Sequence, residues 1–117
     1  MSEDDLSAER VARNEATFRS ANEKISRRAE ELHADGVVPF ICECATRECT
    51  EIVLLPLSEY ERVRGDATLF LCARGHVVAA GPYGELVERR DGYDVVKKLG
   101  RAAEIVKELD PRAREGA

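Results

Sequence analysis

The sequence predicts an α+β fold, and three observations support this fold class. A long segment near the N-terminus lacks Gly and Pro and is rich in Ala, Glu, Arg and Lys, which favour helix. Short runs rich in Val, Ile, Leu and Phe follow it, separated by turns that contain Gly or Pro. A second, shorter amphipathic segment closes the chain. We therefore expect one domain over residues 1–117, with a long N-terminal helix, a small mostly antiparallel sheet and a short C-terminal helix.

The long helix is expected over residues 7–34, with Ser7 as its N-cap, and Asp35-Gly36 ends it. The acidic residues 1–6 before it are expected to form a disordered leader. The apolar residues of the helix recur every seven positions, which gives a narrow seam rather than a broad apolar face. These residues are Val11, Phe18, Ile25 and Leu32.

Two interpretations of this helix remain open from the sequence. In the first, the helix packs on its own domain and its charged side chains are solvated. In the second, it is an arm that projects from the body, and its seam binds a partner helix or a second copy of the chain. The polar residues of the helix could contact a partner in the second case, although solvated side chains explain them more simply. These residues are Arg13, Asn14, Arg19 and Asn22.

The body, expected over residues 37–110, contains five strand-like runs. These runs are Val37–Cys42, Thr50–Leu55, Thr68–Cys72, Glu85–Arg90 and Tyr93–Lys98. The last two flank Asp91-Gly92, a pair that favours a two-residue hairpin with a type I′ turn. Ser58 and Glu61 match a capping box at the start of a short helix. A closing helix is expected over Arg101–Leu109, before Pro111.

Composition and charge exclude several classes of protein. The N-terminus lacks the basic-then-apolar order of a signal peptide, and no apolar run approaches the ~20 residues that span a membrane. We therefore expect a soluble cytoplasmic protein, in which disulfides rarely persist. The formal net charge of -5 argues against nonspecific binding to nucleic acid, which usually requires a basic excess.

Three of the four cysteines, Cys42, Cys44 and Cys49, lie within eight residues in a C-x-C-x4-C pattern. Strand alternation turns Cys42 and Cys44 to one side, while Glu43 faces away. The four-residue loop that follows is short enough to return Cys49 to the same ion. Cysteines clustered in this way in a cytoplasmic protein indicate a structural Zn²⁺ site, a zinc knuckle.

The fourth ligand has two candidates. His76 follows Gly75 in a turn, where its side chain can be aimed freely, and we expect it to complete a site of three cysteines and one histidine. Cys72, at the end of a strand, would instead give an all-cysteine site, and a chain without bound metal is the third alternative. A Gly-rich phosphate loop and an H-E-x-x-H motif are both absent, and Cys72 with His76 is the one Cys–His pair outside the cluster. We therefore expect no enzymatic activity.

Several motifs occur together along the chain. They are Arg13-Asn14-Glu15-x-x-Phe18-Arg19-x-x-Asn22-Glu23-x-Ile25, Phe40-x-Cys42-Glu43-Cys44-x4-Cys49, Glu59-Tyr60-Glu61-x-Val63-Arg64, Gly75-His76 and Tyr93-x-Val95-Val96. In this combination the chain resembles a group of small uncharacterised actinobacterial-type proteins over residues 10–111. The resemblance implies one integrated bacterial domain and adds His76 to the cysteine group, but it implies no activity, substrate or partner. Cys72 stands where an aliphatic residue would be expected.

The sequence thus predicts a non-enzymatic zinc protein that acts as a protein-interaction or regulatory module. Its N-terminal helix is the expected surface for a protein partner or for self-association. One alternative is a nucleic-acid-binding regulator that uses basic residues around the knuckle and the hairpin. These residues are Arg47, Arg62, Arg64, Arg74, Arg89 and Arg90. The other alternative is a thiol redox sensor from which oxidation releases zinc.

Overall fold

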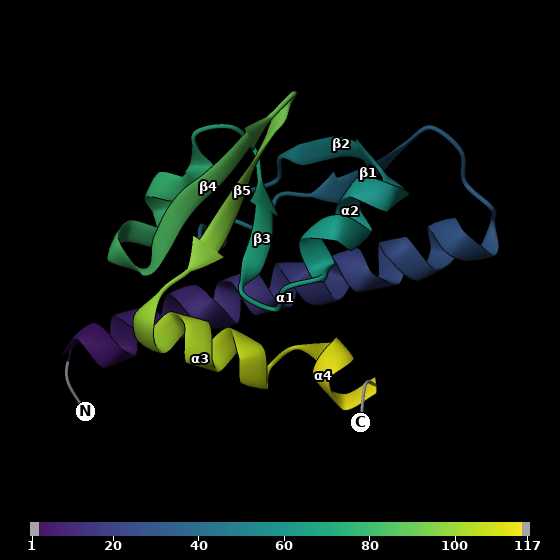
Figure 1. Cartoon of the computed structure of the whole chain (residues 1–117). Coiled ribbons are helices and arrows are strands. Elements are labelled where there is room, and N and C mark those ends of the chain that lie inside the picture. The colour runs from purple at the N-terminus through teal and green to yellow at the C-terminus, as the bar shows by residue number, and fades with distance from the viewer. Residues whose placement is uncertain (1–2, 116–117) are drawn as a thin grey trace.

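The computed structural model describes residues 3–115 and shows an α+β fold, as predicted. Helices lie at both ends of this part of the chain, and the strands lie between them (Figure 1). The elements in chain order are α1 (Glu3–Glu31), β1 (Val37–Ile41), β2 (Ile52–Pro56), α2 (Leu57–Arg64), β3 (Leu69–Cys72), the 3₁₀ segment η1 (His76–Tyr83), β4 (Gly84–Arg90), β5 (Tyr93–Lys98), α3 (Gly100–Glu108) and α4 (Pro111–Glu115).

The strands form two antiparallel sheets instead of the single sheet expected. β1 pairs with β2, and the second sheet has the strand order β3-β5-β4. The two sheets meet just after β1, where the N–H of Glu43 donates to the carbonyl of Leu71 at 2.9 Å. The segment from Cys42 to Cys44 therefore lies at the junction of the two sheets.

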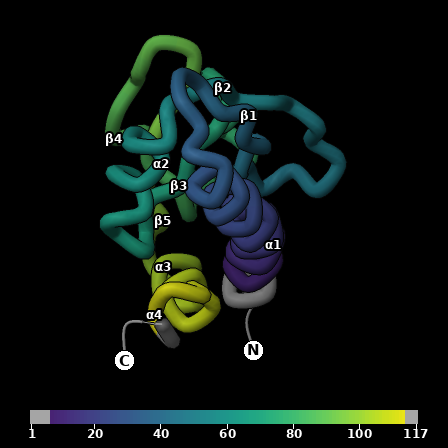
Figure 2. The backbone as a smooth tube through the Cα atoms, turned by 90° about the vertical axis from the view of Figure 1, so that its right-hand side faces the viewer, coloured from purple at the N-terminus to yellow at the C-terminus, as the bar shows by residue number. Residues whose placement is uncertain are grey.

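Helix α1 lies along the body, and two views at right angles place it beside α3 with the sheets on one side (Figures 1 and 2). The buried positions of the helix extend from Ala8 to Ala29, so the interpretation as a projecting arm does not hold over this length. The seam expected to be its contact surface is only half-buried at Val11, Phe18 and Ile25, and Leu32 is 62% exposed. The fully buried positions are Ala8, Ala12, Glu15, Ala16, Arg19, Asn22, Glu23, Ser26 and Ala29.

This buried face combines small residues with polar ones, which explains why the apolar periodicity pointed elsewhere. Ala8 and Ala12 pack against Phe70 and the apolar side of α3, because small side chains let two helices approach closely. The polar residues find partners inside the protein. Arg19 donates to the carbonyls of Ala67 at 2.6 Å and Val106 at 2.7 Å, and its guanidinium lies 4.4 Å from the centroid of the Phe70 ring.

The remaining buried polar residues of α1 also have partners. Glu15 pairs with Lys98, whose Nζ lies 2.7 Å from Oε2 of the carboxylate. Glu23 accepts a hydrogen bond of 2.7 Å from the Tyr60 hydroxyl, and the Tyr60 ring stacks on Phe40 with centroids 4.2 Å apart. The expectation that Arg19 and Asn22 are solvated is therefore wrong, because the body supplies hydrogen-bond partners at positions where the sequence alone suggested water.

Several element boundaries differ from the expected ones. α1 begins at Glu3, so residues 3–6 of the expected leader are helical, and residues 1–2 lie outside the described residues. The N-cap of α2 is Pro56, without a side-chain cap. The capping box is wrong because Glu61 instead accepts from Ser26 and Arg112.

The C-terminal elements follow the expected order with local differences. The β4–β5 hairpin is present, but among the described non-glycine residues only His33 has a positive φ, so Asp91 cannot take part in a type I′ turn. Gly92 alone supplies the left-handed conformation there, at φ 87°. The closing helix ends near Pro111 as expected, but Pro111 then begins a further short helix, α4.

Candidate metal centre

The three clustered cysteines lie where the two sheets join. The antiparallel pairing of β1 and β2 continues one step beyond the strands, because the N–H of Cys42 donates to the carbonyl of Glu51 at 3.0 Å. The chain then leaves β2 and approaches β3 through Glu43. The loop back to Cys49 closes tightly, since the N–H of Cys49 donates to the carbonyl of Thr46 at 3.1 Å. This local geometry brings three sulfur atoms together before any metal is considered.

His76 completes the group. One ligand atom from each of Cys42, Cys44, Cys49 and His76 can be chosen so that all four lie within 4.8 Å of one another. Nδ1 of His76 lies 3.5 Å from Sγ of Cys42 and 3.7 Å from Sγ of Cys49. Zn–S bonds of about 2.3 Å and Zn–N bonds of about 2.0 Å in a tetrahedron place sulfur and nitrogen about 3.5 Å apart. The group could therefore hold a metal ion.

His76 is placed by the turn before it. Gly75 has φ 86°, a left-handed conformation that favours glycine, and its N–H donates to Oδ2 of Asp94 at 2.9 Å. Asp94 is held in turn by Arg89, whose Nε lies 3.0 Å from Oδ1. The N–H of His76 donates to the carbonyl of Ala73 at 3.0 Å. A buried carboxylate on β5 thus fixes the turn that aims the imidazole at the sulfur atoms.

Cys72 lies beside the group but is not one of its four members. Its thiol donates a hydrogen bond to Cys42 and the N–H of Ala73 donates to the same sulfur at 3.2 Å, so the pKa of Cys42 falls to about 5 despite burial. The same hydrogen bond, together with burial, holds the pKa of Cys72 well above its usual range. Cys72 therefore acts on the group as a hydrogen-bond donor to one of its sulfur atoms.

The pKa of the other buried cysteine of the group, Cys44, is shifted in the opposite direction. Burial raises the pKa of Cys44 to about 12, and the nearby charge of Cys42 adds to this shift. All four cysteines are free thiols. A divalent cation that displaces the thiol protons would balance the negative charge of the thiolates.

Two buried polar residues anchor this segment to α1 and β3. Glu43 is fully buried: its Oε1 accepts from the N–H of Leu71 at 3.0 Å, and its Oε2 accepts from Nδ2 of Asn22 at 2.9 Å. Asn22 also bonds both the N–H and the carbonyl of Ile41, at 2.9 and 2.8 Å. Burial raises the pKa of Glu43 to about 7. The backbone that carries Cys42 and Cys44 is thereby fixed on both sides.

A third anchor holds the ligand loop. Nδ2 of Asn14 donates to the carbonyl of Ala45 at 3.0 Å. The sequence pattern does not reveal this role of Asn14, and it does not reveal the anchoring roles of Asn22 and Glu43. The signal that could have found them is spacing, since Asn14 and Asn22 are eight residues apart and so share a face of the helix.

The group is open to solvent on one side only. Cys42 and Cys44 are buried, whereas Cys49 and His76 are half-buried and border a groove of about 320 Å³. The other residues that line this groove are Thr46, Glu48, Thr50, Glu51, Val78 and Ala79. Any exchange of an ion with solvent would therefore pass Cys49 and His76.

The arginines considered for nucleic-acid binding do not form a free basic surface. Arg64 is buried against Asp110 at 2.5 Å, and Arg62 lies 2.8 Å from Glu88. Arg90 also pairs with Glu88, at 3.0 Å, and Arg89 is the partner of Asp94 described above. Four of the six arginines considered are thus paired with carboxylates, two of them sharing Glu88, which reduces their attraction for a polyanion.

Within residues 3–115, no other group of three or more His, Cys, Asp or Glu residues has metal-site geometry, and none of the helices combines the length and the apolar character needed to cross a membrane. Comparison of the chain with protein-family models, curated proteins and solved structures found no match.

Proposed function

We propose that the protein binds one Zn²⁺ through Cys42, Cys44, Cys49 and His76, and that this ion is structural. The observation that carries the proposal is the spacing of the imidazole nitrogen from two sulfur atoms, 3.5 and 3.7 Å, which is the separation a tetrahedral zinc site requires. Four protein ligands fill the tetrahedron, so the ion keeps no open position for a substrate or an activated water. In this proposal the ion has no catalytic role.

The donor set favours zinc over other common metals. Three thiolates and one imidazole are soft or borderline ligands, which exclude Mg²⁺ and Ca²⁺ as resident ions because these prefer oxygen. The net charge of the filled site would be -1, since three thiolates are balanced by two positive charges. The position of the ion between the sheets and the turn at His76 suits a role in holding these segments together.

Metal content and ligand variants test this proposal. Native mass spectrometry of protein purified without chelators should show one zinc per chain, and His76→Ala should weaken zinc binding by about 100-fold or more. Cys72→Val is the matched control, because it removes a buried neighbour that is not one of the four ligands. We expect this variant to retain one zinc. Loss of zinc in Cys72→Val with retention in His76→Ala would overturn the ligand assignment.

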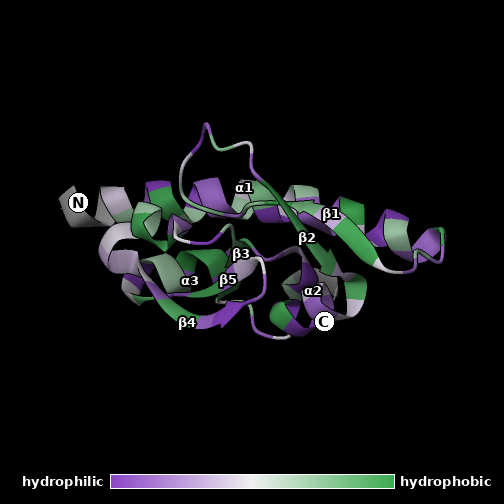
Figure 3. Cartoon of the chain, turned by 90° about the horizontal axis from the view of Figure 1, so that it is seen from above, coloured by the Kyte–Doolittle hydropathy of each residue, from purple (hydrophilic) through white to green (hydrophobic). Residues whose placement is uncertain are grey.

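We propose further that the protein acts through self-association, by an apolar sheet face rather than by α1. β2 pairs only with β1 in the described part of the chain, and an unpaired apolar strand edge is a template for pairing with another strand. Val37, Ile52 and Leu54 are each more than half exposed on the outer face of this sheet. The hydropathy colouring shows much of the ribbon of β2 in green, as its apolar sequence requires (Figure 3).

The proposed partner is a second copy of the chain. Antiparallel pairing of β2 with its counterpart would give a four-stranded sheet and bring Ile52 and Leu54 of both copies together. Light scattering after size exclusion should show dimers that increase with protein concentration, and Leu54→Lys should abolish them. Val87→Lys, at an exposed position on β4, is the control and should leave dimers intact. A wild-type protein that stays monomeric up to about 1 mM would refute this part of the proposal.

A further inference from the structure

A second site borders the ligand loop, on the outer face of α1. A groove of about 440 Å³ is lined by Arg13, Asn14, Thr17, Phe18 and Arg47. Four of these residues come from α1, and Arg47 comes from the loop between Cys44 and Cys49. We propose that this groove binds a phosphate group carried on a small organic molecule, and that zinc binding holds Arg47 in position to take part.

The two arginines supply the charge for a phosphate. Arg47 is exposed and forms no ion pair among the described residues, so its whole guanidinium is free to bind. Arg13 pairs with Glu9 through Nε, at 2.9 Å, which leaves the two terminal nitrogens available. Guanidinium groups bind phosphate oxygens through paired N–H donors, and two of them from separate segments can approach one phosphate from two sides.

The rest of the groove suits the organic part of such a ligand. Phe18 is half-buried and offers an aromatic surface that its own domain leaves partly uncovered. Thr17 donates its hydroxyl to the carbonyl of Arg13 at 2.9 Å, so its oxygen is oriented by the helix. The volume is within the range of small-molecule sites, about 300–1,000 Å³.

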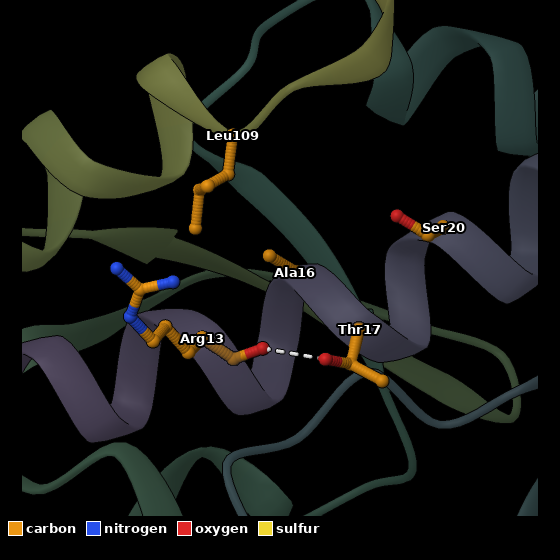
Figure 4. Close-up of a pocket in the computed structure, with 5 residues that line it drawn as sticks. All are labelled: Arg13, Ala16, Thr17, Ser20 and Leu109. Carbon is orange, nitrogen blue, oxygen red and sulfur yellow. Dashed lines mark hydrogen bonds between the residues drawn. The ribbon is translucent and has the colours of Figure 1, made fainter.

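A second hollow lies next to the groove, and a comparison of their linings shows which of the two is better suited to a phosphate ester. Arg13 and Thr17 also border a hollow of about 310 Å³ on the side of α3, together with Ala16, Ser20 and Leu109 (Figure 4). That hollow has a single guanidinium and partly aliphatic walls. The groove with Arg47 adds the second guanidinium and the aromatic ring, so it is the better site for a phosphate ester.

The link between the groove and the metal is the ligand loop. Two residues separate Arg47 from Cys44, and one residue separates it from Cys49. A metal bound by both cysteines would therefore fix both ends of the short loop that carries Arg47. Without the metal, the bond of Asn14 to Ala45 and the turn at Cys49 are the remaining restraints described above. This part of the inference rests on the proposed zinc site. It predicts that removal of zinc weakens phosphate binding although no zinc ligand lines the groove.

Titration calorimetry of the zinc-loaded protein at low salt, with phenyl phosphate and inorganic phosphate as probes, tests the site. We expect phenyl phosphate to bind more tightly than phosphate, and Arg13→Ala or Arg47→Ala to weaken it about tenfold or more. Arg10→Ala, an exposed arginine of α1 outside the groove, should bind like wild type. Glu9→Gln should strengthen binding, because it frees all of Arg13. Equal losses in all three arginine variants, or no binding at 10 mM probe, would overturn the site.

The metal dependence is tested in the same samples. Zinc content is read by native mass spectrometry, and folding after chelation is read by circular dichroism. A zinc-free protein that stays folded should bind phenyl phosphate at least about fivefold more weakly, and unchanged affinity would refute the coupling. If purified protein holds no zinc, the zinc proposal fails, whereas the groove is still tested by the titrations of wild type and of the arginine variants. Binding of a single-stranded oligonucleotide through Arg13 and Arg47 without binding of phenyl phosphate would also overturn the assignment.

Discussion

Two regions of the molecule attach distant segments to α1, and they do so by different chemistry. Near the middle of the helix, Asn14 and Asn22 hold the segment that carries the cysteine group. Directly after Asn22 and about one turn further on, Glu23 and Ser26 hold a network of ion pairs that reaches α2 and α4. The members of this ion-pair network are Glu23, Tyr60, Glu61, Arg64, Asp110 and Arg112.

The difference between the regions lies in their charge balance. In the ion-pair network, Arg112 meets Glu23 at 2.5 Å and Glu61 at 2.8 Å, and Arg64 meets Asp110, so each of the three carboxylates has a guanidinium partner. The cysteine group gathers three ionisable thiols and an imidazole that could hold a metal ion. The network finds its counter-charges within the chain, whereas the negative charge of three thiolates would be balanced by an ion from solution. Four experiments test this difference between the two regions.

Removal of the metal should have the largest effect. Chelation should lower the melting temperature by about 10 °C or more, because the free energy of metal binding contributes directly to folding. Differential scanning calorimetry with and without chelator measures this, and re-addition of zinc should restore the original value. A melting temperature that does not change on chelation would show that the cysteine group, like the ion-pair network, is self-sufficient.

Loss of the central carboxylate of the network should follow in size. Glu23→Ala leaves the buried Tyr60 hydroxyl without its acceptor and the buried Arg64 with Asp110 alone, and removing one partner of a buried ion pair costs about 3–5 kcal/mol. Urea denaturation measures this cost, and the zinc content should stay at one per chain. Glu31→Ala, which removes an exposed partner of Arg28, is the control and should cost less than about 0.5 kcal/mol. A loss of zinc in Glu23→Ala would show that the two regions are not independent.

The pH dependence of the free energy of unfolding should show the contribution of Glu23 to the ion-pair network. Burial alone would raise the pKa of Glu23, but hydrogen bonds from Arg112 and Tyr60 and the charge of Arg64 outweigh it and hold this pKa at about 2. The folded pKa lies below the unfolded value of about 4.3, so the contribution of Glu23 is complete above about pH 5 and is lost as the pH falls toward 2.

The measurement compares wild type with Glu23→Gln by urea denaturation at each pH from 7 to 3. Acid also releases zinc from thiolates, but it does so in both proteins, so the difference between them reports on Glu23. We expect this difference to shrink steadily below about pH 5. A constant difference over the whole range would contradict the assigned pKa shift.

The smallest effects should come from single hydrogen bonds of α1 to each region. Ser26→Ala removes the 3.0 Å bond to Glu61 and should cost about 1 kcal/mol with or without zinc. Asn14→Ala removes the bond to Ala45 and should cost a similar amount only when zinc fixes the ligand loop. Urea denaturation of both variants in both metal states checks this, and an equal cost of Asn14→Ala in both states would mean that the loop is rigid without metal.

Features that depend on short spacings in the chain can be predicted without the structure. The long helix follows from a segment without Gly or Pro, and the β4–β5 hairpin follows from two strand-like runs that flank Asp91-Gly92. The grouping of Cys42, Cys44 and Cys49 also follows from local geometry, because a strand alternation and a four-residue loop suffice to bring them together. In each case the residues that decide the structure are neighbours in the chain.

Which face of α1 is buried depends on contacts with segments that are distant in the chain. Apolar spacing selected Val11, Phe18, Ile25 and Leu32, whereas the protein buries Arg19 and its polar neighbours. The reason is that the partners of Arg19 are carbonyl groups 48 and 87 residues away, and no local pattern reveals that they are present. Burial of a polar side chain is favourable only with such partners.

The same reason governs the fourth position of the metal site. His76 is 27 residues beyond Cys49, and the sequence favours it as the fourth ligand but leaves Cys72 open as the alternative. The left-handed turn at Gly75, held by Asp94 on β5, directs the imidazole to the group and leaves Cys72 as a donor to Cys42. The cysteines of the site are thus a property of the sequence, and the position of His76 among them is a property of the fold.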